Sequence, residues 1–338
     1  MRMNQLKIAV PGILAVLLLV GLPGSAAPAA APSGTITLYT SESDDDVNML
    51  VGDFTRRNPG VRVNVFRAGS GPVVSRIQAE LQAGKIQADV IWFADIDFFR
   101  ILGRRDLLEA YLPPASRGVD SRYHYDGNTM HEVRLIFNVV AFNTRIVRFR
   151  PTSWNDLTLG RYKGRAGMPS PFVSGAAFGH VGTFASMREF GWEYYRKLRA
   201  NDAVVLQSNG MVAQKLASGE IVIAQIVDFF VRALKAQGSP VDHIWPEEGA
   251  LLIPTPVAII KTTANLPAAQ ALVNYLYTPE AQRIFVARSY IPVIPGIPQP
   301  AGTPDVSDLR ILRLNLEFIE RSREEIRRTF AEIFGIQQ

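Results

Sequence analysis

The sequence predicts an α/β protein with two lobes, each built on a sheet of mainly parallel strands that helices cover on both faces. Strand-like and helix-like patterns alternate from residue 35 to residue 93, which is typical of βαβ units. A long apolar segment over 135–142 interrupts this alternation, and a second alternating stretch follows it. The 338 residues suffice for two domains of ordinary size. We expect a ligand cleft between the lobes, because open parallel sheets bind ligands at the carboxyl ends of their strands.

The first lobe is expected to open with a strand over 35–39, where β-branched and aromatic residues predominate. After it, Val47, Leu50, Val51 and Phe54 recur at the spacing of one helical face. The next expected elements are a strand over 61–65, a turn over 69–71, a helix over 73–84 and a strand over 89–93.

The second lobe is expected between the extended segments 135–142 and 254–260. Its expected elements are helices over 179–190, 192–200, 212–218 and 229–237, with strands over 204–206 and 221–226. Two short helices should follow, over 267–276 and from Thr278 onward. Five prolines within 292–304 predict an extended linker, and 305–336 has the charged amphipathic pattern of one terminal helix or a pair.

The N-terminus has the pattern of a cleaved signal peptide. Arg2 and Lys7 precede an apolar run over 8–22, and small residues fill 24–31. The apolar run is shorter than the roughly 20 residues that a membrane-spanning helix needs. We therefore predict cleavage between residues 27 and 31 and export to the periplasm.

These patterns divide the chain into segments. The chain is expected to cross between the lobes near 134–144 and to return near 250–257. The predicted segments are a signal peptide over 1–27, a first part of lobe 1 over 28–138, lobe 2 over 139–254, a second part of lobe 1 over 255–300, and a C-terminal helical segment over 301–338 that packs on lobe 2.

Composition excludes several classes of protein. The chain has no cysteine, so disulfides, thiolate zinc sites, iron–sulfur clusters and cysteine nucleophiles are excluded. The formal charge of +5 falls once Arg2 and Lys7 are removed with the signal peptide. No basic block remains in the exported part, so nucleic acid is not an expected partner.

Four loops lie where a strand is expected to end and a helix to begin, at 40–43, 68–71, 170–176 and 208–210. Each offers hydroxyl or amide groups beside a helix N-terminus, where free backbone N–H groups favour anions. Any one loop could be an ordinary helix cap. Four together favour an anion-binding cleft, and the candidate ligand-binding residues in them are Ser41, Ser70, Gly71, Ser174, Gly175, Ala176 and Asn209.

Acidic and aromatic residues follow the same strands. Glu42, Asp95 and Asp228 are candidate partners for a cationic group on the ligand, and Phe229 could pack against it. Helix capping and surface solvation are the alternative explanation for the acids, and core packing is the alternative for the aromatic ring.

The sequence gives little support for catalysis. Its four histidines lie outside the H-E-x-x-H and H-x-E patterns, and no Gly-x-Ser-x-Gly motif is present. A secreted hydrolase, the alternative from another class, would need a nucleophile and base or a set of metal ligands. We therefore expect a binding protein that is not an enzyme and that holds no cofactor or resident metal.

Eight stretches of the chain match a known family: 36–40, 87–92, 140–144, 173–178, 238–241, 246–249, 256–259 and 277–282. They resemble the periplasmic substrate-binding proteins of ABC importers. Their order and spacing are similar to the type II branch, which includes ferric-iron, phosphonate, sugar-phosphate, thiamine and polyamine binders. The resemblance implies a two-lobed type II fold in which crossing hinge strands join the lobes. It also implies a monomer that closes on a small solute by hinge motion and delivers it to an ABC permease and its ATPase.

The resemblance also bears on the kind of ligand. The tyrosine pair of the ferric binders would fall on Phe229 and Phe230, and phenyl rings cannot ligate a hard cation. A ferric-iron carrier is therefore the disfavoured alternative. Residues 174–176 match the Ser-Gly-Ala helix start that binds the accompanying anion in those relatives, and Asn209 matches their asparagine. The expected ligand is a small anionic or zwitterionic solute that carries a phosphonate or phosphate group.

Overall fold

The computed structural model describes residue 1 and residues 31–337. The chain divides into two units, residues 1–31 and 32–338, and all the elements below lie in the second. The predicted signal peptide lies outside the described residues. Within the described residues, no helix has the length and apolar character needed to cross a membrane.

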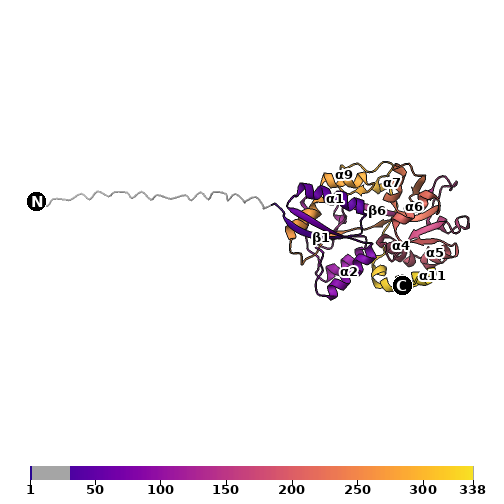
Figure 1. Ribbon diagram of the computed structural model, residues 1–338, viewed down its shortest axis with the longest axis horizontal. Coiled ribbons are helices and arrows are strands. Elements are labelled where there is room, and N and C mark those ends of the chain that lie inside the picture. The colour runs from indigo at the N-terminus through magenta and orange to yellow at the C-terminus, as the bar shows by residue number, and fades with distance from the viewer. Residues whose placement is uncertain (2–30, 338) are drawn as a thin grey trace. The chain divides into compact units, whose positions relative to one another are not determined.

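The first sheet has six strands in the order β2-β1-β3-β12-β5-β4. Strand β1 runs parallel to both β2 and β3, whereas β12 is antiparallel to β3. Their bounds are β1 Gly34–Thr40, β2 Val61–Arg67, β3 Val90–Trp92, β4 His124–Tyr125, β5 Met130–His131 and β12 Val257–Ile259. The associated helices are α1 Asp44–Arg57, α2 Ser70–Gln82, α3 Ile96–Arg104, α8 Leu266–Tyr275 and α9 Pro279–Ala287. This sheet and its helices are called lobe 1 (Figure 1).

The second sheet is centred on the long strand β6, Arg134–Asn143, in which every residue is buried. The other strands are β7 Ala166–Pro169, β8 Val204–Leu206, β9 Ile223–Val227, β10 Val241–Ile244, β11 Ala250–Ile253, β13 Ile291–Pro292 and β14 Ile311–Leu312. The helices are α4 Gly175–Ser186, α5 Gly191–Ala200, α6 Asn209–Ser218, α7 Asp228–Ala236, α10 Leu316–Arg321 and α11 Arg323–Phe334. This sheet and α4–α7 are called lobe 2, and α10 with α11 are called the C-terminal helices.

The chain passes from the first sheet to the second between β5 and β6 and returns between β11 and β12, and these two passages are called the two crossings. After α9 it enters the second sheet once more, at β13. These crossings confirm the two-lobed α/β fold with crossing strands. The segment boundaries drawn from the sequence stay predictions.

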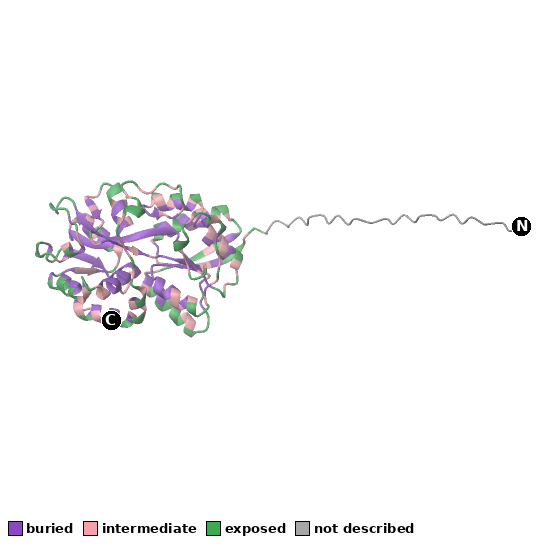
Figure 2. Cartoon of the chain, turned by 180° about the vertical axis from the view of Figure 1, so that it is seen from behind, coloured by how far each residue is buried: buried purple, intermediate pink, exposed green. Residues whose placement is uncertain are grey.

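The cores are made by apolar faces at the predicted spacing. Val47, Leu50 and Phe54 of α1 are all at most 2% exposed. The central strands such as β3, β6 and β9 are buried, whereas the helices keep one exposed face (Figure 2). The C-terminal helices pack Ile319 and Phe330 into the same apolar cluster as α4 and α5.

Some elements differ from the sequence-based expectations. Helix α4 begins at Gly175 rather than at residue 179, because Ser174 caps it by accepting from the Ala177 N–H. The C-terminal segment over 305–336 forms a helix pair, α10 and α11, which was one of the two expected forms, and a short strand β14 precedes the pair. The expectations missed α3, β10, β11 and the β4–β5 hairpin. Strands β10 and β11 are four residues long and depend on pairing with the distant strand β6.

Candidate functional site

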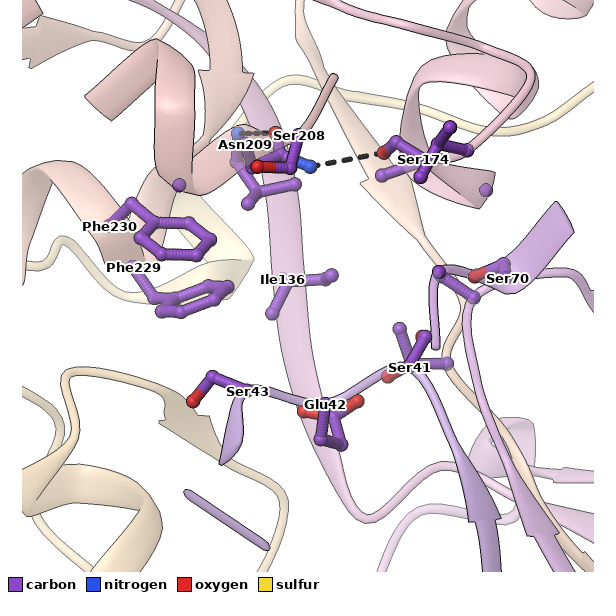
Figure 3. Close-up of a pocket in the computed structure, with 18 of the residues that line it drawn as sticks. Ser41, Glu42, Ser43, Ser70, Ile136, Ser174, Ser208, Asn209, Phe229 and Phe230 are labelled. Atoms are coloured by element: carbon purple, nitrogen blue, oxygen red, sulfur yellow. Dashed lines mark hydrogen bonds between the residues drawn. The ribbon is translucent and has the colours of Figure 1, made fainter. Parts of the chain in front are cut away.

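A cavity of about 360 Å³ opens between the two lobes (Figure 3). Its walls are the loops that follow β1, β2, β7, β8 and β9. These loops lie at the carboxyl ends of parallel strands and lead into the helices that come next. Both crossings contribute to it as well, through Arg134 and Ile136 on β6 and Thr255 before β12. The cavity therefore lies where closure of the lobes would enclose a ligand.

The lobe 1 wall is formed by hydroxyl and acidic groups. Ser41, Glu42 and Ser43 follow β1 directly, and Ser43 caps α1 by accepting from the Asp46 N–H. Ser70 lies in the first turn of α2 and is 2% exposed. In the described part of the chain, the hydroxyls of Ser41 and Ser70 make no hydrogen bond to protein, so both can donate to a bound oxyanion.

A buried ion pair lies at the base of the cavity. The Arg134 guanidinium binds the Glu42 carboxylate, and both side chains are at most 5% exposed. The guanidinium carbon lies 4.0 Å from the centre of the Tyr290 ring, a cation–π contact that orients it. Burial raises the pKa of the Glu42 carboxyl, and the charge of Arg134 opposes that rise. The Arg134 Nε has no hydrogen-bond partner among the described residues, so the arginine keeps a donor free.

A second arginine borders the cavity nearer to solvent. Arg67 ends β2, and its Nε donates to the Glu42 carbonyl oxygen at 2.9 Å. Its side chain remains 41% exposed. Asp44 and Asp45 also line the cavity, with side chains 74% and 79% exposed. This side of the cavity therefore offers charges of both signs.

The lobe 2 wall joins two helix starts through side chains. The Asn209 Nδ2 donates to Ser174 Oγ at 3.0 Å, and the Val227 N–H donates to Asn209 Oδ1 at 3.3 Å. Asn209 thus links the first turn of α6, the cap of α4 and the end of β9. The backbone N–H groups of Gly175 and Ala176 come before the first hydrogen bond within α4, and both residues line the cavity.

An aromatic pair completes this wall. Phe229 and Phe230 lie in the first turn of α7 with ring centres 4.3 Å apart, and Phe229 also contacts Tyr290 at 4.1 Å. Figure 3 shows both rings on one side of the cavity and Ser70 and Ser174 on the other. The described residues contain no group of three histidine, aspartate or glutamate side chains placed to hold a metal ion.

The structure brings most of the predicted site residues together. Those that line the cavity are Ser41, Glu42, Ser70, Ser174, Gly175, Ala176, Asn209 and Phe229. Gly71 lies just outside, where its N–H donates to the Val173 carbonyl oxygen of lobe 2 at 3.3 Å.

Asp95 and Asp228, two of the proposed acidic partners, do not line the cavity. The Asp228 carboxylate is fully buried, and it accepts from the Phe137 N–H at 3.0 Å and from Arg232 at 2.7 Å. Asp95 caps α3 and binds Arg323. Both carboxylates already have partners within the protein, so the structure gives neither of them a ligand-facing role.

Sequence reasoning missed Arg67, Arg134 and Tyr290. Arg67 stands at the carboxyl end of a predicted strand, the same signal that selected the serines. Arg134 is a lone charge at the start of a long apolar run, which could have marked it as a buried, paired group. Tyr290 carries no local signal, because only the fold brings the residue before β13 under the cavity.

A family model described as "Bacterial extracellular solute-binding protein" matches residues 88–321. The chain belongs to this family. A relative from Salmonella paratyphi A, named a putative 2-aminoethylphosphonate-binding periplasmic protein, is 26% identical over 274 residues, which cover 75% of this chain and 78% of that protein.

Solved structures of periplasmic binding proteins share the fold. The protein AfuA from Actinobacillus pleuropneumoniae, with fructose-6-phosphate bound, has a TM-score of 0.80 at 22% identity and covers 90% of this chain and 100% of its own. Iron-bound HitA from Pseudomonas aeruginosa has a TM-score of 0.77 at 20% identity, with 89% and 99% covered. The chain is therefore a type II periplasmic binding protein of an ABC importer, a solute-binding component of transport.

Proposed function

We propose that this solute-binding protein captures a small organic solute bearing a phosphonate or phosphate group and delivers it to the permease of its importer. The observation that carries the proposal is the convergence of three helix starts, those of α2, α4 and α6, on one cavity. Free N–H groups and the helix dipoles at these starts favour an oxyanion, and Ser41, Ser70 and Ser174 add hydroxyl groups. The binding named for the Salmonella relative supports the same chemical class.

The ligand is proposed to be a zwitterion with an ammonium group. Asp44 and Asp45 supply negative charge at the cavity edge, where both are exposed and only loosely paired, Asp44 with Arg67 at 4.0 Å and Asp45 with Arg288 at 3.6 Å. The faces of Phe229 and Phe230 can receive a cation by cation–π contact. The three acids expected from the sequence to meet a cationic group, Glu42, Asp95 and Asp228, are instead bound to Arg134, Arg323 and Arg232. The oxyanion would then lie toward Ser174 and Ser70.

The remaining parts of the proposal concern the whole carrier. It acts as a monomer, leaves the cytoplasm on its N-terminal signal peptide, and closes by motion of the two crossings between the sheets. The permease and its ATPase then recognise the closed form. The fold and relatives are those of binding proteins rather than enzymes.

Isothermal calorimetry tests the ligand class. The protein is first unfolded in guanidinium and refolded to remove any solute, and then titrated with 2-aminoethylphosphonate, ethylphosphonate, fructose-6-phosphate, sulfate and spermidine. We expect binding of 2-aminoethylphosphonate, and weaker binding of ethylphosphonate, which lacks the ammonium group. Binding of spermidine alone, or of none of the five, would contradict the proposal.

A ferric titration tests the alternative carrier. Ferric citrate should produce no visible tyrosinate absorption band, because phenylalanines line the position of the tyrosine pair. A coloured complex that survives dialysis would favour the iron carrier instead.

A further inference from the structure

The C-terminal helices contact both lobes, but by different chemistry. Toward lobe 2 the contacts are apolar. Ile319, Ile326 and Phe330 are at most 2% exposed and share a core cluster with Phe178 and Phe184 of α4. Burial of this kind anchors the helices firmly to lobe 2 (Figure 1).

Toward lobe 1 the same helices present charges. Arg323 Nη1 lies 2.9 Å from Asp97 Oδ2 and 3.1 Å from Asp95 Oδ1, and its Nη2 also binds Asp95. These three side chains are at most 12% exposed. Glu320 forms a second pair with Arg104, with 3.2 Å between Oε2 and Nη1. Both pairs end on α3, whose apolar residues Phe98, Phe99 and Leu102 belong to a lobe 1 core cluster.

The pairs lie beside the ligand cavity at a point where the lobes meet closely. Asp95 directly follows Ala94, and a Cβ added at Gly175 on lobe 2 would stand 1.6 Å from the Ala94 carbonyl oxygen. Ala94 and Gly175 both line the cavity. Separation of the lobes would therefore pull α3 away from Arg323 and Glu320.

Each of the three charged groups of the buried cluster, Asp95, Asp97 and Arg323, also has a second stabilising contact within its own lobe. Asp95 caps α3, and Asp97 lies in the first turn of that helix, where the helix dipole favours a negative charge. The Arg323 guanidinium stacks over the Phe178 ring at 4.7 Å. When the lobes separate, water and these local contacts can stabilise the charges. The free-energy cost of opening this contact is therefore lower than that of opening an apolar one.

We infer that Arg323 and Glu320 form a clasp between the lobes. The C-terminal helices hold the clasp on lobe 2, α3 receives it on lobe 1, and the ion pairs bias the ligand-free protein toward the closed arrangement. The clasp lies outside the binding cavity, so it sets the closed fraction without touching the solute.

Distance measurements between spin labels test the clasp. The chain has no cysteine, so Gln78→Cys on α2 and Lys197→Cys on α5 give one label in each lobe, both at exposed positions. The protein is freed of solute by unfolding and refolding, which makes the result independent of the proposed ligand. In this background, Arg323→Gln should lower the ratio of short to long distances about tenfold, as expected for the loss of a hydrogen-bonded charge pair.

Arg321→Gln is the matched control. It removes the same charge from the neighbouring helix, and among the described residues the one acid that the Arg321 guanidinium approaches is Glu317 of its own helix. The control should keep the distance distribution of the parent. Coincident distributions for the Arg323 and Arg321 variants would overturn the clasp. If Arg323→Gln shows no cooperative melting, Glu320→Gln takes its place, and an unchanged ratio there overturns the clasp as well.

Discussion

Ser174 illustrates how one side chain in this cavity serves both the fold and the site. Its hydroxyl accepts from the Ala177 N–H and so starts α4, and it also accepts from Asn209. The same hydroxyl lines the cavity beside the free N–H groups of Gly175 and Ala176. Its own hydrogen remains available to an oxyanion, because both hydrogen bonds to protein use it as an acceptor.

Ser174→Ala should therefore weaken binding of an anionic solute by about 1–3 kcal/mol, because a donor to a charged group is lost. It should also lower the free energy of unfolding by about 1 kcal/mol through loss of the cap. Calorimetry with 2-aminoethylphosphonate and urea denaturation measure the two effects separately. Ser218→Ala, at the far end of α6, is the control and should leave the affinity unchanged. An unaltered affinity in the Ser174 variant would remove Ser174 from the site.

At the scale of elements, the lobes meet through the starts of α2 and α4. The Gly71 N–H donates to the Val173 carbonyl oxygen, and a Cβ at Gly69 would stand 2.5 Å from Val173 Cγ1. Glycines at these positions let the two helix starts approach each other. The requirement for glycine here comes from close contact between the lobes, and neither Gly69 nor Gly71 has a positive φ.

Gly175→Ala should keep the lobes apart, because the added Cβ would stand 1.6 Å from a backbone carbonyl oxygen that cannot move aside easily. The label pair on Gln78 and Lys197 should report a longer mean distance. Gly52→Ala makes the same substitution in α1, where the new Cβ would meet no described atom within 4 Å beyond the backbone of its own helix, so it should leave the distance unchanged. A Gly175 variant with the parent's distances would show that the lobes do not need this contact.

At the scale of the whole molecule, one buried acid lies where the chain crosses between the sheets. Glu132 lies between β5 and β6, and its Oε2 accepts from the Thr255 N–H of the return crossing at 3.0 Å. Burial raises the pKa of its carboxyl to about 8, and the hydrogen bond from Thr255 only partly offsets that rise. The protonation state of the Glu132 carboxyl therefore affects the contact between the two crossings.

The raised pKa gives a signed pH dependence of stability. The folded state holds the Glu132 proton up to about pH 8, whereas the unfolded chain releases it near its ordinary pKa of 4.5. The free energy of unfolding should fall as pH rises between these values, by up to about 1.4 kcal/mol per pH unit. Glu132→Gln cannot titrate at this position. In urea denaturation from pH 5 to pH 9, the free energy of unfolding of the variant should therefore increase relative to that of the parent as pH rises. Parallel curves would mean that Glu132 is ionised in the folded protein at neutral pH.

The sequence by itself determined the alternating elements, the two-lobed α/β class and most of the cavity wall. It could do so because helix caps, apolar periodicity and strand ends are local signals, and Ser41, Ser70, Ser174 and Asn209 all stand at such ends. The tertiary structure decided which charges face the ligand. Asp95 also follows a strand, yet Arg323 binds it from 228 residues away along the chain, because a carboxylate binds whichever cation the fold brings within reach. Asp228 is different, since Arg232 lies four residues further along the same helix, a spacing that the sequence already shows. Arg134, Tyr290 and the clasp became visible only when distant segments were packed together.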